Sequence, residues 1–567
     1  MLESLALILL LQVLVEEVTV TAEEPADSAS AGIVPAAELE RKPLQRPADV
    51  LESVPGLTIS QHSGEGKANQ YYLRGFNLDH GTDLAIDVAG VPVNMPTHGH
   101  GQGYADLNFL IPELIGDVAW RKGPYFADAG DFASAGQIGI GYATALDRPL
   151  VVLQAGQFGY QRLLAAASRP LFGGVLLGAL ETVGNDGPWE RPDALRKNNA
   201  LVRFTRGGGS VAAMLYDARW NATDQIPDRA VRSGALSRFG LVDDTNGGET
   251  HRYSLSGDWQ RARGNSVTQF AAYALDYRLD LFSNFTYFLD DPVNGDQFEQ
   301  LDDRRVFGGS ATHRWSSGAA GVQLRRDEID RVGLYRTSAR QRLSTANEAA
   351  LAQTSGGVWA QQSIEWSPRV RTVIGARADR IDARRSDSLV SPKASLIFGP
   401  WRNVELYLNA GSGFHSNDAR TESDDLLVRT RGAEAGVRAQ LGTAELSASF
   451  WRLDAASELL FVGDAGTTEA RGASRRAGVE LTGAVRLTRR VAIDADLAWS
   501  RARFRNGDRI PGAVEGVAAV GLSLTDLGPV SAELRYRYFG PRPLVEDNRV
   551  RSQASSLVSA RASYAIA

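Results

Sequence analysis

The stretch "VAIDADLAWS", residues 491–500, alternates between two kinds of side chain at every step. Its apolar residues occupy every second position: Val491, Ile493, Ala495, Leu497 and Trp499. The positions between them carry Ala, Asp or Ser. Because successive side chains of a β-strand point to opposite faces of a sheet, this pattern predicts a strand with one apolar and one polar face.

The same alternation recurs in "VELTGAVRL" (residues 479–487) and "AELRYRYF" (residues 532–539), and short strands separated by turns extend from about residue 147 to the end. Both soluble sandwiches and membrane barrels show such alternation. Roughly 420 residues divided among about 22 strands, as in plugged outer-membrane transporters, leave about 19 residues for each strand and its connection. We therefore expect a mainly β chain with an antiparallel transmembrane barrel of about 22 strands over residues 147–567. A soluble all-β assembly is the alternative.

The composition excludes several classes of function. The chain has 61 Lys and Arg against 67 Asp and Glu, a formal net charge of -6 and no basic block, so we expect no nucleic-acid partner. It has no cysteine, which excludes disulfides, thiolate metal sites and cysteine nucleophiles. Common hydrolase, metalloprotease, phosphate-loop and dinucleotide motifs are missing, so we expect neither an enzyme nor a required cofactor. We expect the paired acids Asp243/Asp244 and Asp302/Asp303 to lie in solvated loops.

The part of the chain before residue 147 divides into three segments. The apolar run "LALILLLQVLV", residues 5–15, is about half as long as a membrane-spanning helix. We expect residues 1–15 to be the remnant of a signal peptide, or else a short buried or disordered terminus. Within residues 16–46, the part from Glu23 onward is rich in Ala, Glu and Pro and predicts a linker. Residues 47–146 predict a small α+β domain with one short helix at "ADVLESV".

Several pieces of this α+β domain, in order, resemble the TonB-dependent outer-membrane receptors. They are "ADVLESVPGLTIS" (48–60), "YYLRGFN" (71–77), "IDVAGVPVN" (86–94) and "IPELIGDVAWRKGPYFADAGDFASAGQIGI" (111–140), joined in the barrel by "GSGFHSNDAR" (411–420). The resemblance implies a monomer in the lipid of a bacterial outer membrane, with the α+β domain as a plug inside the barrel. It implies energy-coupled uptake of a scarce ligand, most often a ferric siderophore or another metal chelate. A passive porin-like channel and a direct Zn, Cu or Ni receptor of the same fold are the alternatives.

The segment "EEVTVTA", residues 16–22, resembles the TonB box of this family. The resemblance implies that an extended box pairs as an added strand with the periplasmic protein TonB, which the ExbB/ExbD complex energises. The expected box residues are Glu17, Val18, Thr19, Val20 and Thr21. The alternative is that residues 18–21 form the first strand of the plug.

Two further expectations follow from the resemblance. Arg74, Arg121 and Lys122 lie in the plug, and we expect them to pair with inward-facing acids of the barrel such as Glu480. The chain stops at Ala567 without the aromatic-terminated last strand of the family, and its start lacks a basic region. We therefore expect truncation at one or both ends.

A histidine-containing loop is the candidate site for ligand. "NMPTHGHGQGYADLNF", residues 94–109, contains two histidines two residues apart, which an extended chain places about 6 to 7 Å from each other on one side. With upstream residues they form a candidate metal site: His98, His100, His80 and Asp79. The candidate ligand contacts are His80, His98, His100, Gln102, Tyr104 and His415. The alternatives are contact with a chelate, direct metal coordination, and a structural loop whose histidines hydrogen-bond the barrel wall.

Overall fold

The computed structural model describes residues 27–61, 65–78, 81–420, 425–462 and 467–566. The expected signal-peptide remnant, the expected TonB box, His80 and Asp79 lie outside these ranges. Within them, no helix is both long and apolar enough to cross a membrane.

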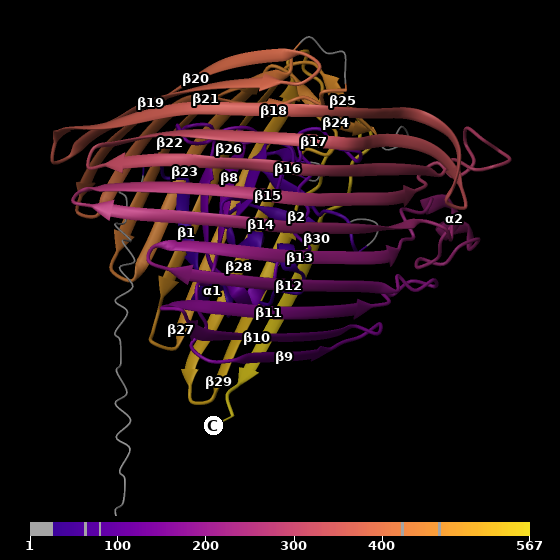
Figure 1. Cartoon of the computed structure of the whole chain (residues 1–567), viewed down its shortest axis with the longest axis horizontal. Helices are drawn as coiled ribbons and strands as arrows, with labels where there is room; N and C mark the ends of the chain where they lie inside the picture. The colour runs from indigo at the N-terminus through magenta and orange to yellow at the C-terminus, as the bar shows by residue number, and fades with distance from the viewer. Residues whose placement is uncertain (1–26, 62–64, 79–80, 421–424, 463–466, 567) are drawn as a thin grey trace, which may run out of the picture.

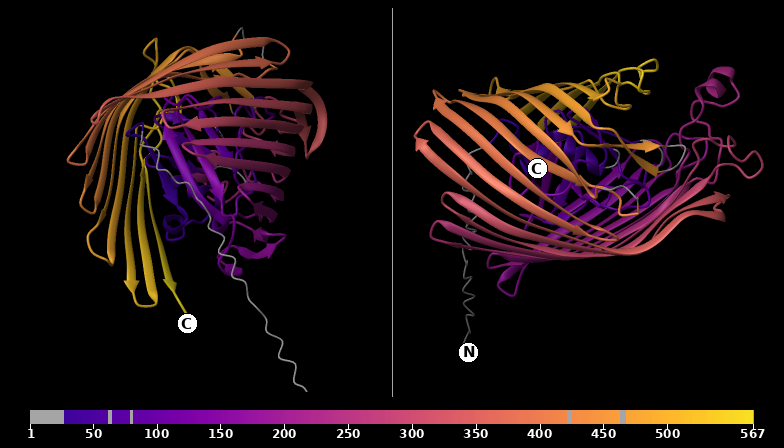
Figure 2. Two further views of the ribbon diagram at one scale, coloured as in Figure 1. Left: turned by 60° about the vertical axis from the view of Figure 1, so that its left-hand side comes forward. Right: turned by 90° about the horizontal axis from the view of Figure 1, so that it is seen from above.

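Most of the chain forms one antiparallel barrel, which Figures 1 and 2 show from three sides. Its twenty strands are β9 (Leu150–Ala155), β10 (Gln161–Leu171), β11 (Gly174–Asn185), β12 (Leu195–Arg206), β13 (Gly209–Asn221), β14 (Gly247–Arg263), β15 (Ser266–Ser283), β16 (Phe298–Trp315), β17 (Gly318–Ser338), β18 (Gln341–Ser367), β19 (Val370–Asp382), β20 (Ser386–Trp401), β21 (Val404–Ser416), β22 (Leu427–Leu441), β23 (Ala444–Ala455), β26 (Ser474–Arg486), β27 (Val491–Phe504), β28 (Gly516–Leu527), β29 (Val530–Phe539) and β30 (Ser555–Tyr564). A short helix, α2 (Asp228–Ser233), lies between β13 and β14. A separate hairpin, β24 (Glu458–Val462) and β25 (Thr467–Arg471), lies between β23 and β26.

The predicted fold class is confirmed, and the described residues form twenty barrel strands where the sequence predicts about 22. The prediction assumes strands of about ten residues, the length that spans a membrane. Strands β14 to β18 have 17, 18, 18, 21 and 27 residues. A chain of given length therefore makes fewer and longer strands.

The alternation of "VAIDADLAWS" is confirmed in β27, and its orientation shows what the barrel faces. Trp499 is 76% exposed and Leu497 is 49% exposed, whereas Asp496 is 8% exposed. The apolar face thus points out of the barrel and the polar face points in, toward the plug. A soluble sandwich would bury the apolar face, so this orientation is that of a membrane barrel.

The plug lies inside the barrel and contains two small sheets (Figure 2). Its elements are β1 (Ala31–Pro35), α1 (Ala36–Leu39), the 3-10 helix η1 (Pro47–Ser53), β2 (Thr58–Ser60), β3 (Gln70–Leu73), β4 (Phe76–Asn77), β5 (Leu84–Val88), β6 (Val91–Pro92), the 3-10 helix η2 (Pro112–Leu114), β7 (Ile115–Lys122) and β8 (Gly136–Tyr142). One sheet has the order β1-β7-β8-β5-β6 and the other has the order β2-β3-β4.

The plug begins earlier in the chain than the sequence predicts. Strand β1 lies within residues 16–46, where we expected a linker, and it pairs antiparallel with β7, with Ile33 opposite Ala119. Val34 is buried, so this short strand is stabilised by its neighbour in the sheet as well as by burial. Five residues between Ala-rich and Pro-rich flanks give too short a pattern to identify a strand from the sequence.

Candidate functional site

The histidine-containing loop follows β6 and is closed at its base by backbone hydrogen bonds. The Met95 N–H donates to the Tyr104 carbonyl at 2.9 Å, and the Gly103 N–H donates to the Met95 carbonyl at 2.7 Å. The Asn94 side chain accepts from the Ile86 N–H at 2.8 Å and donates to the carbonyls of Gly81 and Leu84. These contacts fix where the loop leaves the plug sheet and therefore where its histidines lie.

His98 is fully buried and both of its ring nitrogens have partners. The His100 N–H donates to His98 Nδ1 at 3.1 Å, so the proton of the neutral ring is on Nε2, which lies 3.0 Å from the Tyr277 hydroxyl of β15. The ring stacks on Tyr104 at a centroid distance of 4.2 Å. Burial lowers the pKa of His98 well below its usual value, and the nearby Arg304 and Arg420 lower it further. His98 is therefore neutral at pH 7.

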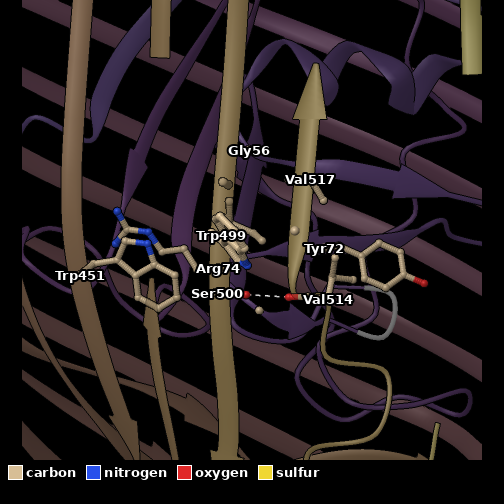
Figure 3. A pocket seen from close by; sticks show the side chains of 12 residues that line it. Gly56, Tyr72, Arg74, Trp451, Trp499, Ser500, Val514 and Val517 are labelled. Atoms are coloured by element: carbon tan, nitrogen blue, oxygen red, sulfur yellow. Dashed lines mark hydrogen bonds between the residues drawn. The ribbon is translucent and has the colours of Figure 1, made fainter. Parts of the chain in front are cut away.

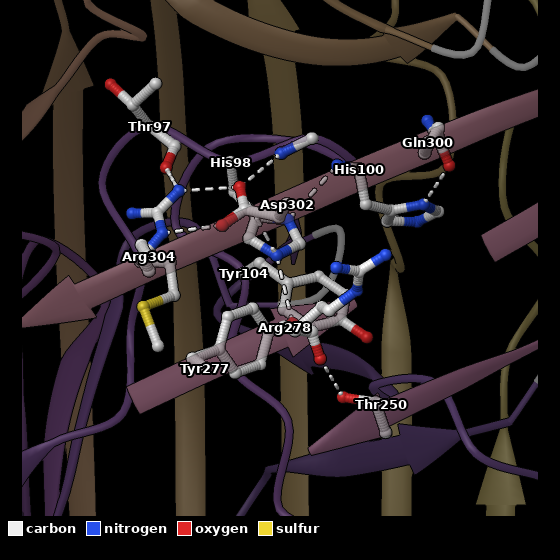
Figure 4. A network of polar contacts seen from close by, with 12 residues as sticks. Thr97, His98, His100, Tyr104, Thr250, Tyr277, Arg278, Gln300, Asp302 and Arg304 are labelled. Carbon is white, nitrogen blue, oxygen red and sulfur yellow. Dashed lines mark hydrogen bonds and ion pairs between the residues drawn. The ribbon is translucent and has the colours of Figure 1, made fainter. Parts of the chain in front are cut away.

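Two charged residues of β16 hold the loop against the barrel wall (Figure 4). Asp302 Oδ2 accepts from the Gly99 N–H at 2.9 Å, and Asp302 also accepts two hydrogen bonds of 2.6 Å from the Arg304 guanidinium. Arg304 donates to the Thr97 carbonyl as well. Both charged side chains are completely shielded from solvent. The loop backbone is thus bound on both sides of His98 by one buried ion pair.

The remaining loop candidates are also buried and hydrogen-bonded. His100 Nδ1 lies 2.6 Å from Gln300 Oε1, so the ring donates to that amide oxygen. Gln102 donates to the Ser416 carbonyl at 2.9 Å and accepts from the Asp418 N–H at 3.0 Å. The Tyr104 hydroxyl accepts from the Ala68 N–H at 2.9 Å. Three of the four loop candidates therefore bind the barrel, and Tyr104 supports His98 from within the plug.

His415 lies at the end of β21 and contacts a different part of the plug. Its Nδ1 is 3.0 Å from Asp83 Oδ1, and both side chains are buried. In the described ranges, no group of three or more His, Cys, Asp or Glu side chains is placed to hold a metal ion. Hydrogen bonds connect His98 and His100 to one another and to β15 and β16. His415 is bound separately, to Asp83. Metal binding by His98 and His100 with His80 and Asp79 stays a prediction.

The three predicted plug cations differ in their partners. Arg74 Nη2 lies 2.6 Å from Glu434 of β22 and 3.0 Å from Glu480 of β26. Lys122 lies 3.2 Å from Glu480. Arg121 pairs at 2.8 Å with Asp128, which belongs to the plug itself. Arg74 and Lys122 thus bind the plug to the wall, and Arg121 forms an ion pair within the plug.

The turn between β3 and β4 explains how Arg74 reaches the wall. Leu73 pairs with Phe76, so Arg74 and Gly75 form a two-residue hairpin loop with φ of 51° and 70°. Positive φ at both positions is what a type I′ turn requires. A Cβ atom on Gly75 would lie 2.7 Å from the Ser500 hydroxyl oxygen, so glycine is also required for the close approach to β27.

Asp302 and Arg304 are site residues that the sequence analysis missed. We expected Asp302 in a solvated loop, but β16 begins at Phe298 and Asp302 is 0% exposed. Gln300, Asp302 and Arg304 are spaced two residues apart and share the inward face of the strand. A spacing of two residues indicates one face of a β-strand. Polar residues also lie on the opposite face, however, so polar and apolar residues do not alternate here and the strand cannot be recognised from the sequence.

A barrel filled by an N-terminal plug, which buried ion pairs hold to the wall, defines the class of plugged outer-membrane barrels. The family model described as "TonB dependent receptor-like, beta-barrel" matches residues 182–567, and the model described as "TonB-dependent Receptor Plug Domain" matches residues 24–137. The chain belongs to the TonB-dependent receptor family. It is therefore an outer-membrane β-barrel protein of a family of receptors coupled to TonB.

Solved structures of this class are similar along nearly the whole chain. The ferric citrate transporter FecA in its unliganded form has a TM-score of 0.79 at 13% identity, covering 95% of this chain and 90% of that one. The ferric yersiniabactin uptake receptor FyuA from Yersinia pestis has a TM-score of 0.76 at 15% identity, with coverage of 94% and 90%. The copper transporter OprC has a TM-score of 0.74 at 19% identity, with coverage of 95% and 90%. At these identities the likeness is one of fold.

Proposed function

We propose that this protein takes up a scarce small ligand, a ferric siderophore or another metal chelate, across the outer membrane. TonB, energised by the ExbB/ExbD complex, supplies the work that displaces the plug. The observation that carries the proposal is the buried set of plug-to-wall contacts, above all Arg74 with Glu434 and Glu480. Removing one partner of a buried ion pair costs about 3 to 5 kcal/mol. Spontaneous opening is therefore rare, and transport needs an external source of energy.

The same contacts argue against a passive porin-like channel. In addition to Arg74, Asp302 and Arg304 hold the His98 loop to β16, and Glu113 of the plug pairs with Arg162 of β10 at 2.6 Å. In a passive channel, solutes diffuse through an open pore, and a plug attached to several parts of the wall would block that pore. The attachments suit a closed state that opens only when the periplasmic partner pulls.

The choice of a chelate as ligand is supported by the similar structures and by the state of the loop histidines. FyuA and FecA are described as receptors or transporters for ferric chelates. Both ring nitrogens of His98 are hydrogen-bonded, so a bare metal ion would have to displace either the contact with Tyr277 or the one with the His100 N–H. A chelate brings its own metal ligands and needs only polar contacts from the protein.

Growth under iron limitation tests the proposal. A bacterial host without its own ferric-chelate receptors, with and without this protein, receives a panel of ferric siderophores and ferric citrate. We expect this protein to support growth on at least one chelate, and a protonophore to stop short-term uptake of that radiolabelled chelate. Uptake that continues after the protonophore would indicate a passive channel. No growth on any chelate would overturn the chelate assignment.

A direct metal-ion receptor is the second candidate, because the H-x-H pair lies in the plug loop and OprC is described as a copper transporter. Titration of the purified protein with Zn, Cu, Ni and Fe, for wild type and His98→Ala/His100→Ala, decides between the two. Loss of affinity in the variant would favour this candidate. Equal affinities would remove it, since no other feature of the loop points to a bare ion.

A further inference from the structure

The plug does not contact the barrel wall equally on all sides. Its main apolar core continues into the wall along β10–β13, β15 and β16, where most of its wall residues lie, and it also includes Trp451 and Leu453 of β23. The wall residues in this shared core include Leu164, Leu177, Leu201, Tyr216, Leu275 and Val306. On this side, separating plug and wall would expose large apolar side chains of both to water.

Strands β27 to β29 form a different contact. Among the described residues, none from these three strands belongs to the shared apolar core. The plug instead approaches β27 through the backbone of Gly56 and Gly75. A Cβ atom on Gly56 would lie 3.1 Å from Ala498 Cβ, and one on Gly75 would lie 2.7 Å from the Ser500 oxygen. A glycine backbone facing small side chains lets the two surfaces separate without unlocking interdigitated side chains.

Two adjoining cavities lie between the plug and these strands. The first is lined by residues that include Arg74, Gly75, Trp451, Ser500 and Val514 (Figure 3). The second is lined by residues that include Glu52, Leu57, Asp496, Ala519, Arg535 and Arg537. Both include Gly56 and Val517, so the second continues the first along the strands. We call the two together the seam.

The seam is lined by apolar side chains together with several charged groups, and it has room for water. Its lining carries the charged groups of Arg74, Arg535, Arg537, Glu52 and Asp496. Trp451 Nε1 at the first cavity is buried and has no hydrogen-bond partner among the residues that the structure describes. Buried polar atoms of this kind are commonly satisfied by ordered water, and each cavity is large enough for it.

Arg74, which lines the first cavity, binds Glu434 of β22 and Glu480 of β26 beside the seam. Among the described residues, few side-chain contacts join the plug to β27–β29 themselves. Arg537 of β29 forms an ion pair with Glu52, and this arginine is 26% exposed. The Tyr72 ring meets Phe539 edge to face at 4.9 Å. Arg542, just after β29, lies over the Tyr72 ring at 5.5 Å. A partly exposed ion pair and these two ring contacts resist separation less than a continuous apolar core does.

From these observations we propose that the plug parts from β27–β29 first and stays against β10–β16, so that the seam widens into the path of passage. The charged lining of the seam fits a compact polar or charged solute. The identity of the transported solute rests on the proposed function. The side on which the plug opens is a property of this chain and can be tested without a ligand or TonB.

The test uses two engineered disulfides, and the lack of any native cysteine makes each pair unambiguous. Gly56→Cys/Ala498→Cys closes the seam. Gly90→Cys/Ala271→Cys is the matched control on β15, where a Cβ atom on Gly90 would lie 3.9 Å from Ala271 Cβ. The Gly90–Ala271 separation lies within the usual Cβ–Cβ range of a disulfide and the Gly56–Ala498 separation slightly below it, and both glycines have positive φ, 72° and 76°. The two variants therefore carry similar backbone strain.

The readout is the KCl conductance of the purified full-length protein in planar bilayers, with urea added below the concentration that unfolds the barrel. We expect wild type and the oxidised β15 pair to conduct, and the oxidised seam pair to stay closed until dithiothreitol is added. Conductance by the oxidised seam pair equal to wild type would overturn the proposal. So would an equal block by the β15 pair.

A second measurement covers the case in which a double variant folds poorly. Single variants Ala519→Cys, at the seam, and Ala271→Cys, on β15, react with a charged thiol reagent as urea is raised. We expect Cys at 519 to react at lower urea than Cys at 271. Simultaneous reaction, or the reverse order, would contradict opening at the seam. Neither measurement depends on uptake in cells, so failure here is distinct from failure of the proposed function.

Discussion

Arg74 of the plug and Glu434 of the barrel wall meet at 2.6 Å with both side chains completely shielded from solvent. Glu480 lies on the other side of the same guanidinium nitrogen at 3.0 Å and also contacts Lys122. Two cations and two carboxylates thus neutralise one another at the boundary between plug and barrel. Charges buried in this way stabilise the closed state only as a complete set.

Replacing Arg74 by Met should loosen the plug. The change leaves two buried carboxylates with Lys122 as their remaining cation, and we expect a loss of about 3 to 5 kcal/mol in the stability of the plug-barrel contact. The urea concentration at which trypsin cleaves the plug measures the effect. Arg121→Met is the matched control, because Arg121 pairs with Asp128 inside the plug and is 30% exposed, so its loss should cost about 0 to 1 kcal/mol. Equal shifts in the two variants would show that the wall contact has no special role.

Replacing Asp302 by Ala should release the His98 loop. Asp302 accepts hydrogen bonds from Gly99 and Arg304, and its removal leaves Arg304 buried with Asp327 at 3.3 Å. We expect destabilisation of about 3 to 5 kcal/mol and faster hydrogen exchange at the loop amides. Asp303→Ala is the control, since Asp303 is adjacent and 40% exposed, and surface changes of this kind fall within about 0.5 kcal/mol. Unchanged loop exchange in Asp302→Ala would refute this account of the loop.

His98 should make the closed state sensitive to acid. Burial holds its folded-state pKa well below the usual value, and Arg304 and Arg420 lower it further. As the pH falls below about 6.5, the unfolded loop binds a proton that the folded loop does not, so stability is present above that pH and declines below it. His98→Gln removes this contribution, and its plug stability should fall less between pH 7 and pH 5 than that of wild type. Parallel pH profiles would assign the acid sensitivity to other groups.

Removing the expected TonB box should separate binding from uptake. Deletion of residues 17–22 leaves every described plug-to-wall contact in place, so we expect unchanged binding of the supporting chelate and no uptake. A finer test compares Val20→Pro with Val20→Thr. Proline removes one backbone N–H from the added strand and should reduce uptake, whereas threonine keeps that N–H and should not. Normal uptake in Val20→Pro would contradict pairing at this position.

The sequence predicted the parts of the fold that follow a regular pattern. β27 was evident because apolar and polar residues alternate along it, and the barrel-and-plug class followed from many such strands and the plug pieces. β16 was missed at its start, because near Asp302 both faces of the strand are polar and the inward face is buried by the plug. Burial against a distant plug loop leaves no mark on the local pattern. The partners of His98 depend on where the loop lies relative to β15 and β16. That position cannot be predicted from any single stretch of the sequence.

The unequal strand lengths shape the outer opening of the barrel. At about 3.4 Å per residue, β18 is roughly 90 Å long and β29, on the other side, roughly 35 Å long. Even with a tilt of about 40°, β18 rises well beyond an apolar band about 25 Å tall, and residues 341–348 at its upper end are exposed. By strand length the rim is therefore oblique, extending farther at β17–β18 than at β27–β29. A bulky molecule diffusing along the cell surface is screened on the high side, and its shortest approach to the plug passes over the low one.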